Sequence, residues 1–146
     1  MKRTNLLPLI ILGLLFTSAC GPAAEPTEDH SQHAEASGIQ LNNGQKWTAN
    51  PETTTGIANM TRLMENFDQQ TAGTEEYQEL GKQLQAEFGE IFRKCTMTGE
   101  AHEQLHHFLL PMVEPMKTLQ AGEGESLADV YQQLQDHLTT YSNYFQ

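Results

Sequence analysis

The residues whose chemistry stands out gather in one short stretch of the sequence. It contains a thiol at Cys95, a thioether at Met97 and imidazoles at His102, His106 and His107. If the stretch is helical, one turn separates His102 from His106, their Cβ atoms lie about 5–6 Å apart, and both rings can reach one ion. Thiolate and thioether ligands favour Cu(I), whereas imidazole with thiolate also suits Zn²⁺ or Cu²⁺. The stretch therefore predicts a copper or zinc site formed by Cys95, Met97, His102 and His106, with His107 facing solvent.

The same histidines permit a second interpretation. His102, Glu103 and His106 spell H-E-x-x-H, which resembles the motif of zinc metalloproteases. By that resemblance the two histidines would bind zinc, Glu103 would be the catalytic general base, and Glu125 or Asp129 would stand near the place of a third ligand. The longer metzincin pattern does not continue beyond the second histidine. A small zinc peptidase is therefore the alternative to a metal-binding protein without catalysis.

Four further methionines, Met60, Met64, Met112 and Met116, repeat with the helical period. Methionine is a flexible filler of hydrophobic cores, so packing alone explains such a stripe. In an up-and-down arrangement of helices the same thioethers would extend a sulfur-rich lining inward from the metal site, with His137 at a similar depth to His106. The sequence leaves open whether these methionines are core residues or ligands.

The elements that must position these residues are helices. From residue 50 onward the apolar residues recur every three or four positions, which indicates amphipathic helices. Four segments are marked by residues typical of helix starts, bends and ends. The first starts at Asn50 and Pro51, and the second starts at Thr74. The third starts near Gly99, bends near Pro111 and Pro115 and ends at Gly122, and the fourth starts at Ser126 with Asp129. Their short connections predict an all-α fold, an antiparallel four-helix bundle within a domain of residues 39–146.

A short non-helical pattern precedes the helices. Asn42, Asn43 and Gly44 form a turn signal between an apolar stretch beginning at Ile39 and one ending at Trp47. This pattern predicts a small hairpin-like clasp at the start of the folded domain.

The N-terminus carries a targeting signal. Lys2 and Arg3 precede the apolar run 6–16, which is too short to span a bilayer as a helix. The run ends in Thr-Ser-Ala before Cys20, which resembles the lipobox of bacterial lipoproteins. The resemblance implies that residues 1–19 are a signal peptide and that Cys20 becomes lipid-modified, anchoring the chain to a membrane.

The segment after Cys20 predicts how the domain is attached and in which compartment it lies. Residues 20–38 are rich in Ala, Glu, Pro and Ser and contain no large apolar residue, which is typical of a disordered tether. Gly21 at its start resembles lipoproteins sent to the outer membrane, so the domain would be periplasmic or surface-facing. His30 and His33 in the tether would add a loose capture site for metal.

The excess of acidic residues argues for some classes of binding partner and against others. Without the two basic residues of the signal, the chain has six basic and 19 acidic residues, a formal charge of −13. Such an acidic chain argues against nucleic acid as a partner and raises the local concentration of cations. The sequence has two cysteines, so acylation of Cys20 would leave Cys95 as the one thiol in an oxidising compartment.

These observations predict a membrane-tethered envelope lipoprotein that binds copper or zinc for sequestration or transfer, with an envelope metal-transport protein as a possible partner. The helical domain weakly resembles small helical metal-handling proteins of the bacterial envelope, through its Cys-x-Met and His-x-x-x-His spacings. Two alternatives stay open: the zinc peptidase, and a structural or interaction lipoprotein without metal.

Overall fold

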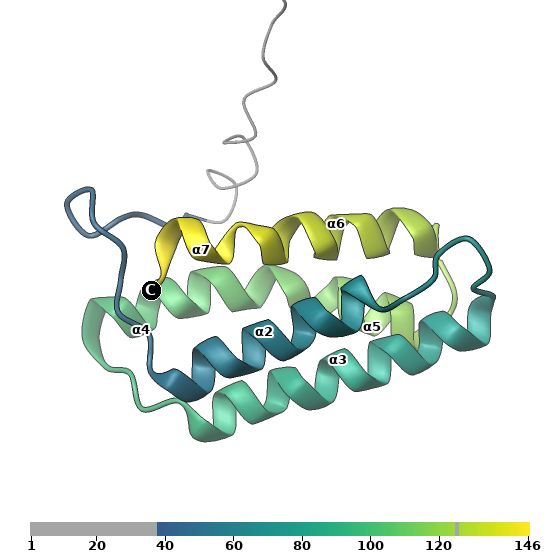
Figure 1. Cartoon of the computed structure of the whole chain (residues 1–146), viewed down its shortest axis with the longest axis horizontal. Helices are drawn as coiled ribbons and strands as arrows, with labels where there is room; N and C mark the ends of the chain where they lie inside the picture. The colour runs from purple at the N-terminus through teal and green to yellow at the C-terminus, as the bar shows by residue number, and fades with distance from the viewer. Residues whose placement is uncertain (1–37, 125) are drawn as a thin grey trace, which may run out of the picture.

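The computed structural model describes residues 38–124 and 126–146, and this part of the chain is helical with no β-strand. Its elements are α2 (Pro51–Glu65), α3 (Thr74–Lys94), α4 (Gly99–Leu109), the 3₁₀ helix η1 (Leu110–Met112), α5 (Val113–Ala121), α6 (Leu127–Thr139) and α7 (Tyr141–Tyr144) (Figure 1). The predicted all-α class is therefore confirmed for the described residues. No helix among them is long and apolar enough to cross a membrane.

Several predictions concern residues outside the described ranges. They are the signal peptide 1–19, the lipidated Cys20, the tether up to residue 37 with Gly21, His30 and His33, and the alternative zinc ligand Glu125. They stay predictions from the sequence.

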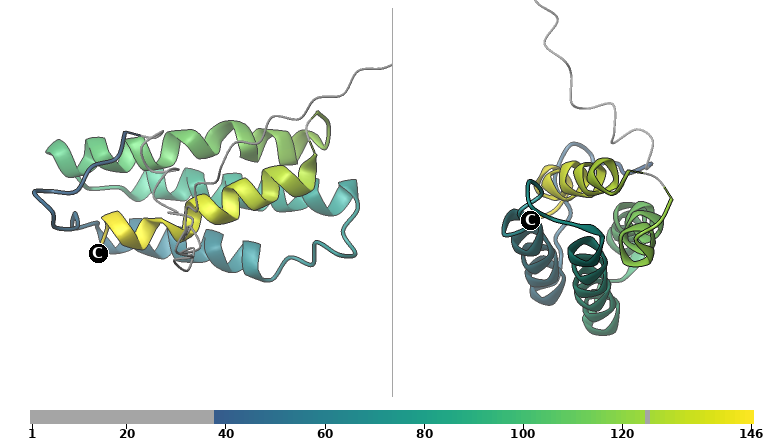
Figure 2. Two further views of the ribbon diagram at one scale, coloured as in Figure 1. Left: turned by 90° about the horizontal axis from the view of Figure 1, so that it is seen from above. Right: turned by 90° about the vertical axis from the view of Figure 1, so that its right-hand side faces the viewer.

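The helices lie side by side as four segments: α2, α3, α4 with η1 and α5, and α6 with α7 (Figures 1 and 2). The helix α3 packs against α2 and α5, and α6 packs against the same two helices. The end-on view in Figure 2 places the four segments around a common interior. Each segment therefore turns one face toward a shared core.

Three of the expected helix ends are where the sequence places them. The first helix begins at Pro51, and Asn50 before it is extended. Gly122 ends α5 in the left-handed conformation with φ of 70°, which suits glycine. Ser126 precedes α6, and its Oγ accepts a hydrogen bond from the backbone N–H of Asp129 at 3.4 Å.

The expected cap of the second helix is wrong by one residue. Thr74 is the first residue of α3, and Gly73 occupies the N-cap position. A glycine has no side chain to cap the helix, but its own N–H donates to Glu76 Oε2 at 2.9 Å. The reciprocal half of a capping box is thus present without the usual serine or threonine.

The third segment breaks at Pro111. The helix α4 ends at Leu109, and the chain passes through η1 before α5 begins at Val113. Proline cannot donate the backbone hydrogen bond that an uninterrupted helix needs here. Pro115 lies in the first turn of α5, where a missing N–H costs nothing, so the break expected there is absent.

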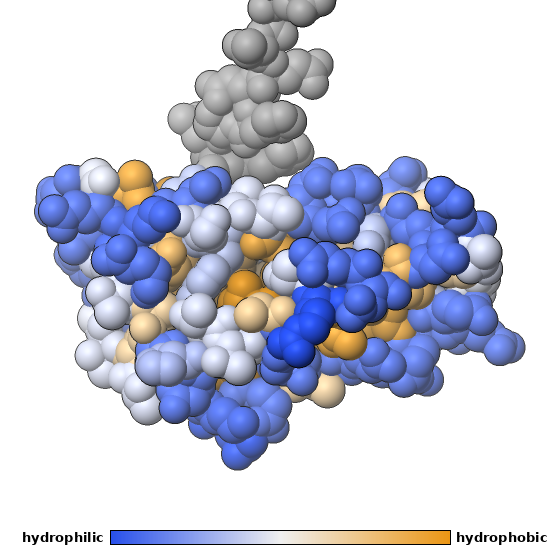
Figure 3. All heavy atoms as spheres, in the orientation of Figure 1, coloured by the Kyte–Doolittle hydropathy of each residue, from blue (hydrophilic) through white to orange (hydrophobic). Residues whose placement is uncertain are grey.

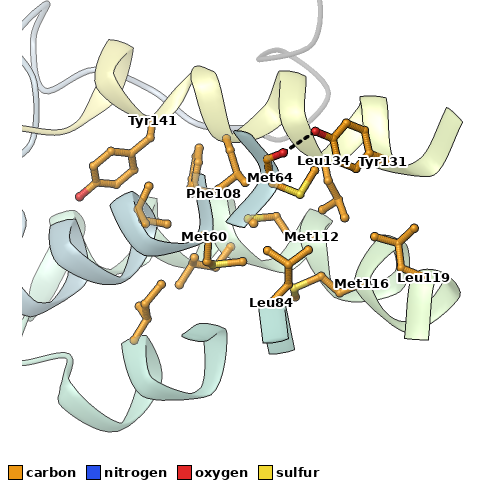
Figure 4. Close-up of a cluster of buried hydrophobic side chains, with 14 of the residues drawn as sticks. Met60, Met64, Leu84, Phe108, Met112, Met116, Leu119, Tyr131, Leu134 and Tyr141 are labelled. Carbon is orange, nitrogen blue, oxygen red and sulfur yellow. Dashed lines mark hydrogen bonds between the residues drawn. The ribbon is translucent and has the colours of Figure 1, made fainter. Parts of the chain in front are cut away.

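The interior is a single hydrophobic cluster to which every segment contributes (Figure 4). The largest fully buried side chains are Phe108, Met60, Met64, Leu84, Ile91, Leu105, Leu109, Met112, Met116, Leu119, Leu134 and Thr53. The hydroxyl of Tyr131 donates to the backbone carbonyl of Met64 at 2.6 Å and fastens α6 to the last turn of α2 (Figure 4). The sequence patterns did not single out Phe108 or Thr53 as core residues.

The N-terminal clasp differs from a hairpin. Asn42 and Gln45 exchange two backbone hydrogen bonds of 2.9 Å, so the predicted turn is confirmed. The chain then leaves this turn, and Trp47 forms a parallel bridge with Phe145 instead of pairing with the residues before the turn. The clasp therefore joins the start of the domain to its last helix.

Candidate metal centre

A pocket lies where α3 ends and α4 begins, and it contains most of the residues singled out for chemistry. Its volume is about 210 Å³, and it is lined by Ile91, Phe92, Cys95, His102, Leu105, His106 and Leu109. Ile91, Leu105 and Leu109 are 1% exposed and belong to the core. The pocket therefore has an apolar floor, with the thiol and imidazoles around it.

His102 and His106 are positioned by α4. The two histidines are four positions apart on this helix, so they fall about one turn apart on the same side, and both are half-buried. Their ring centroids are 4.4 Å apart with 71° between the ring planes. Phe92 from α3 lies against the second ring, with centroids 5.7 Å apart. Both imidazoles are thus held together beside the pocket.

Cys95 is positioned by the end of α3. The helix stops at Lys94, and Cys95 takes an extended backbone conformation with φ of −64° and ψ of 124°. Its thiol is free and partly buried. A three-residue connection then leads to α4. This local geometry brings the thiol and the two histidines to one pocket, although Cys95 and His106 are eleven positions apart in the sequence.

Met97 is not among the residues that line this pocket. It is partly buried and packs against the hydrophobic core from the connection between the two helices. The structure thus brings together three of the four predicted ligands, Cys95, His102 and His106, and leaves the thioether outside.

The three ligand candidates are not arranged to grip an ion as they stand. In the described ranges, no three or more His, Cys, Asp or Glu side chains form a group that could hold a metal. Coordination by Cys95 and both histidines would require their side chains to rotate toward one another. Cys95 follows the last residue of α3 in extended backbone.

Glu103 lines a different hollow. This second space lies between α4 and the clasp, where Glu103 is found with Glu100, Gln104 and Trp47. The backbone N–H of Gln40 donates to Gln104 Oε1 at 2.7 Å and holds the clasp there. The carboxylate that a peptidase would need as general base therefore faces the clasp, away from the histidine pocket.

The four regularly spaced methionines are core residues. Met60 and Met64 come from α2, Met112 from η1 and Met116 from α5, and none is more than 1% exposed. Figure 4 shows their side chains gathered in the interior among leucine and aromatic side chains. Their predicted inward orientation is confirmed, and the packing interpretation accounts for it.

The remaining histidines have other contacts. His137 Nε2 lies 2.7 Å from the carbonyl oxygen of Phe108, and its ring stacks on the Phe108 ring with centroids 4.6 Å apart. Because a carbonyl oxygen only accepts, this nitrogen must carry the proton. His107 is exposed, as predicted. Its ring lies beside Gly38, since a Cβ atom built on that glycine would be 3.8 Å from His107 Nδ1.

Two cations share one carboxylate at the end of α3. Hydrogen bonds from Arg93 and Lys94 lower the pKa of Glu90 from 4.5 to about 2. Lys94 Nζ lies 2.9 Å from Glu90 Oε2, and Arg93 bonds the same carboxylate. Both cations of this exposed cluster are therefore bound to the carboxylate of Glu90.

No family model, curated protein or solved structure matches this chain.

Proposed function

We propose that the chain is a membrane-tethered lipoprotein of the bacterial envelope that binds copper or zinc for sequestration or transfer. The observation that carries this proposal is the shared pocket of Cys95, His102 and His106, with the two imidazole centroids 4.4 Å apart. We also infer that the four helical segments form an antiparallel bundle, which the packing of α3 and α6 against both α2 and α5 supports.

The donor set suits a transition metal. One thiolate and two imidazoles make three protein ligands, which leaves a coordination position of Zn²⁺ or copper open. An open position allows a ligand from another molecule to enter before the protein ligands leave, as transfer requires. Met97, two residues after the C-cap Cys95, is near enough along the chain to supply a thioether if the connection shifts. Without the signal segment the chain has six basic and 19 acidic residues, and its formal charge of −13 favours the approach of cations.

The proposed location rests on the lipobox-like sequence before Cys20. A diacylglycerol on this sulfur would hold the domain at the membrane, with the outer membrane suggested by Gly21. An envelope metal-transport protein is then the partner that such a domain would meet. Mass spectrometry of the chain from a membrane fraction should show an acylated N-terminal cysteine. A Cys20→Ser variant should lack the lipid and leave that fraction; unchanged membrane retention would contradict the anchor.

Metal titration tests the site. Within the described ranges the buried hydrophobic residues run from Ile39 to Phe145, so a chain beginning at Gly21 keeps all of them. We expect Cys95→Ser and His106→Ala each to weaken binding of Cu(I) or Zn²⁺, measured against a chromophoric chelator, by more than about tenfold. Co²⁺ should give a thiolate charge-transfer band that Cys95→Ser removes.

His107→Ala is the matched control, because it removes an exposed imidazole next to the site in sequence. Its affinity should equal that of the parent chain. If the Cys95, His106 and His107 variants all bind metal with the parent affinity, the proposed site is wrong.

A further inference from the structure

A larger pocket lies at the other end of α3, beside the connection from α2. It has a volume of about 350 Å³, which falls in the range of small-molecule sites, about 300–1,000 Å³. Its lining residues are Leu63, Asn66, Phe67, Asp68, Thr71, Ala72, Glu76, Glu79, Leu80 and Gln83. Figure 3 shows apolar surface in orange among hydrophilic residues between the end of α2 and the start of α3.

Part of the pocket wall is apolar and fixed by packing, namely Leu63, Phe67, Ala72 and Leu80. Leu80 is 4% exposed and belongs to the core, and Phe67 packs against that core. The Phe67 ring stacks on Tyr131, with centroids 5.4 Å apart, and tilts against Tyr77 at 4.9 Å. Two buried tyrosines thus hold the aromatic wall in place. An apolar guest would therefore meet a surface that needs little reorganisation.

All charged residues that line the pocket are acidic: Asp68, Glu76 and Glu79. Glu79 Oε2 lies 3.6 Å from Lys82, which offsets part of its charge. Asp68 and Glu76 form no ion pair with a lysine or arginine in the described part of the chain. The rim of the pocket is therefore negative.

The two unpaired carboxylates are held in place by hydrogen bonds. Asp68 Oδ1 accepts from the backbone N–H of Gln70 at 3.0 Å, and Oδ2 accepts from the hydroxyl of Thr71 at 2.9 Å. Glu76 Oε2 accepts from the backbone N–H of Gly73 at 2.9 Å. Both carboxylates are exposed, line the pocket and are oriented by these hydrogen bonds.

We propose that this pocket binds an organic cation with an apolar body, of the alkylammonium class. The aliphatic part would fill the space between Leu63, Ala72 and Leu80, where burial of apolar surface favours binding. The ammonium group would lie between the carboxylates of Asp68 and Glu76. An ammonium near the Phe67 ring gains a further cation–π attraction. An anion with the same apolar body would meet only like charge.

This proposal does not depend on the proposed metal site. Leu80 in this pocket and Ile91 in the other are eleven residues apart on α3, about 16 Å along the helix axis. Variants in one pocket therefore leave the other unchanged, and either proposal can fail alone.

The probes for the test share one apolar body. Hexyltrimethylammonium, hexanol and hexyl sulfate are titrated into the chain beginning at Gly21, by calorimetry and by NMR of the pocket residues. We expect saturable binding of the cation that weakens with added salt, because salt screens the carboxylates. Hexanol and hexyl sulfate should bind at least tenfold more weakly. Equal binding of the cation and the sulfate would overturn the proposal.

Two variants separate charge from shape. The double variant Asp68→Asn, Glu76→Gln keeps oxygen acceptors for the local hydrogen bonds and removes both charges, and it should weaken binding about three- to tenfold. Ala72→Leu fills the hollow and leaves the charges, and it should abolish binding. Unfolding midpoints verify that each variant is folded.

The control is Glu103→Gln, an exposed carboxylate in the hollow beside the clasp, which should bind the cation as the parent chain does. Parent affinity in both the charge variant and the Ala72→Leu variant would overturn the proposal. So would self-association of the parent chain that Ala72→Leu abolishes, since a second copy would then be the occupant.

Discussion

Gly56 and Ile91 meet so closely that a Cβ atom on Gly56 would lie 2.4 Å from Cγ1 of Ile91. The contact joins α2 to α3. The two helices can approach this closely because residue 56 is a glycine and has no side chain beyond a hydrogen atom. Ile91 also forms part of the floor beneath Cys95, His102 and His106. The spacing of these two helices therefore sets the shape of the candidate metal pocket.

Gly56→Ala should destabilise the fold. The new methyl group forces the Ile91 side chain out of its position, an overpacking that costs about 1–3 kcal/mol, partly offset by the better helix propensity of alanine. Urea unfolding should show a net loss in the free energy of unfolding. Gly89→Ala is the matched control, because a Cβ at this exposed helical glycine meets nothing within 4 Å. It should stabilise the chain by about 0.5–1 kcal/mol.

Gly81→Ala should destabilise the fold more than Gly56→Ala does. A Cβ on Gly81 would lie 2.5 Å from the backbone nitrogen of Gln120 and 2.9 Å from its Cα atom. A side chain such as Ile91 can rotate away, whereas backbone cannot, so α3 and α5 would have to separate. The same urea titration measures the difference. A smaller loss for Gly81→Ala than for Gly56→Ala would contradict the close approach of these helices.

The cluster at the end of α3 should make stability depend on acid pH. Hydrogen bonds from Arg93 and Lys94 lower the pKa of Glu90 from 4.5 to about 2 in the folded chain. A lowered pKa contributes stability above pH 4.5, and this contribution is lost as the pH falls toward 2. The free energy of unfolding should therefore decrease across this window.

Glu90→Gln should flatten that part of the pH profile, and Arg93→Met should flatten it partly. The effect should shrink at high salt, because the cluster is exposed. A profile that keeps its slope between pH 4.5 and 2 in Glu90→Gln would assign the acid sensitivity to other carboxylates.

Tyr131→Phe should cost about 0.5–1.5 kcal/mol of unfolding free energy through the lost hydrogen bond. The hydroxyl donates to the carbonyl of Met64 at 2.6 Å in a buried setting. That carbonyl keeps a second donor, the backbone N–H of Phe67 at 3.1 Å, so it is not left unpaired. Tyr141→Phe should cost less, since its hydroxyl partner is Thr54, an exposed residue that water can satisfy.

The helices were predictable from the sequence because their ends carry recognisable residues. Pro51, Gly122 and Ser126 act locally, so neighbouring residues suffice to place them. The cap at Gly73 was missed because glycine has no side chain that could mark it as a cap. The hydrogen bond at this helix start runs from the backbone N–H of Gly73 to the carboxylate of Glu76. The pairing of Trp47 with Phe145 joins residues about a hundred positions apart, which no local pattern indicates.

The candidate site was predictable to the extent that helical spacing determines it. His102 and His106 fall together because they share one helix, and Cys95 joins them because its helix ends one residue earlier. Met97 lies in the connection between α3 and α4, where no helical repeat determines the direction of its side chain. The side chain packs against the core and not in the pocket. Glu103 follows the same rule, since a residue next to His102 on a helix points about 100° away.

The clasp determines how the domain would carry tension. A force that pulls the chain at Gly38 first meets the hydrogen bond from Gln40 to Gln104 and then the bond from Trp47 to the carbonyl of Tyr144. Both lie ahead of the first helix in the path of the load. The first hydrogen bonds to be loaded are therefore made to the third and last helical segments, before the chain reaches α2.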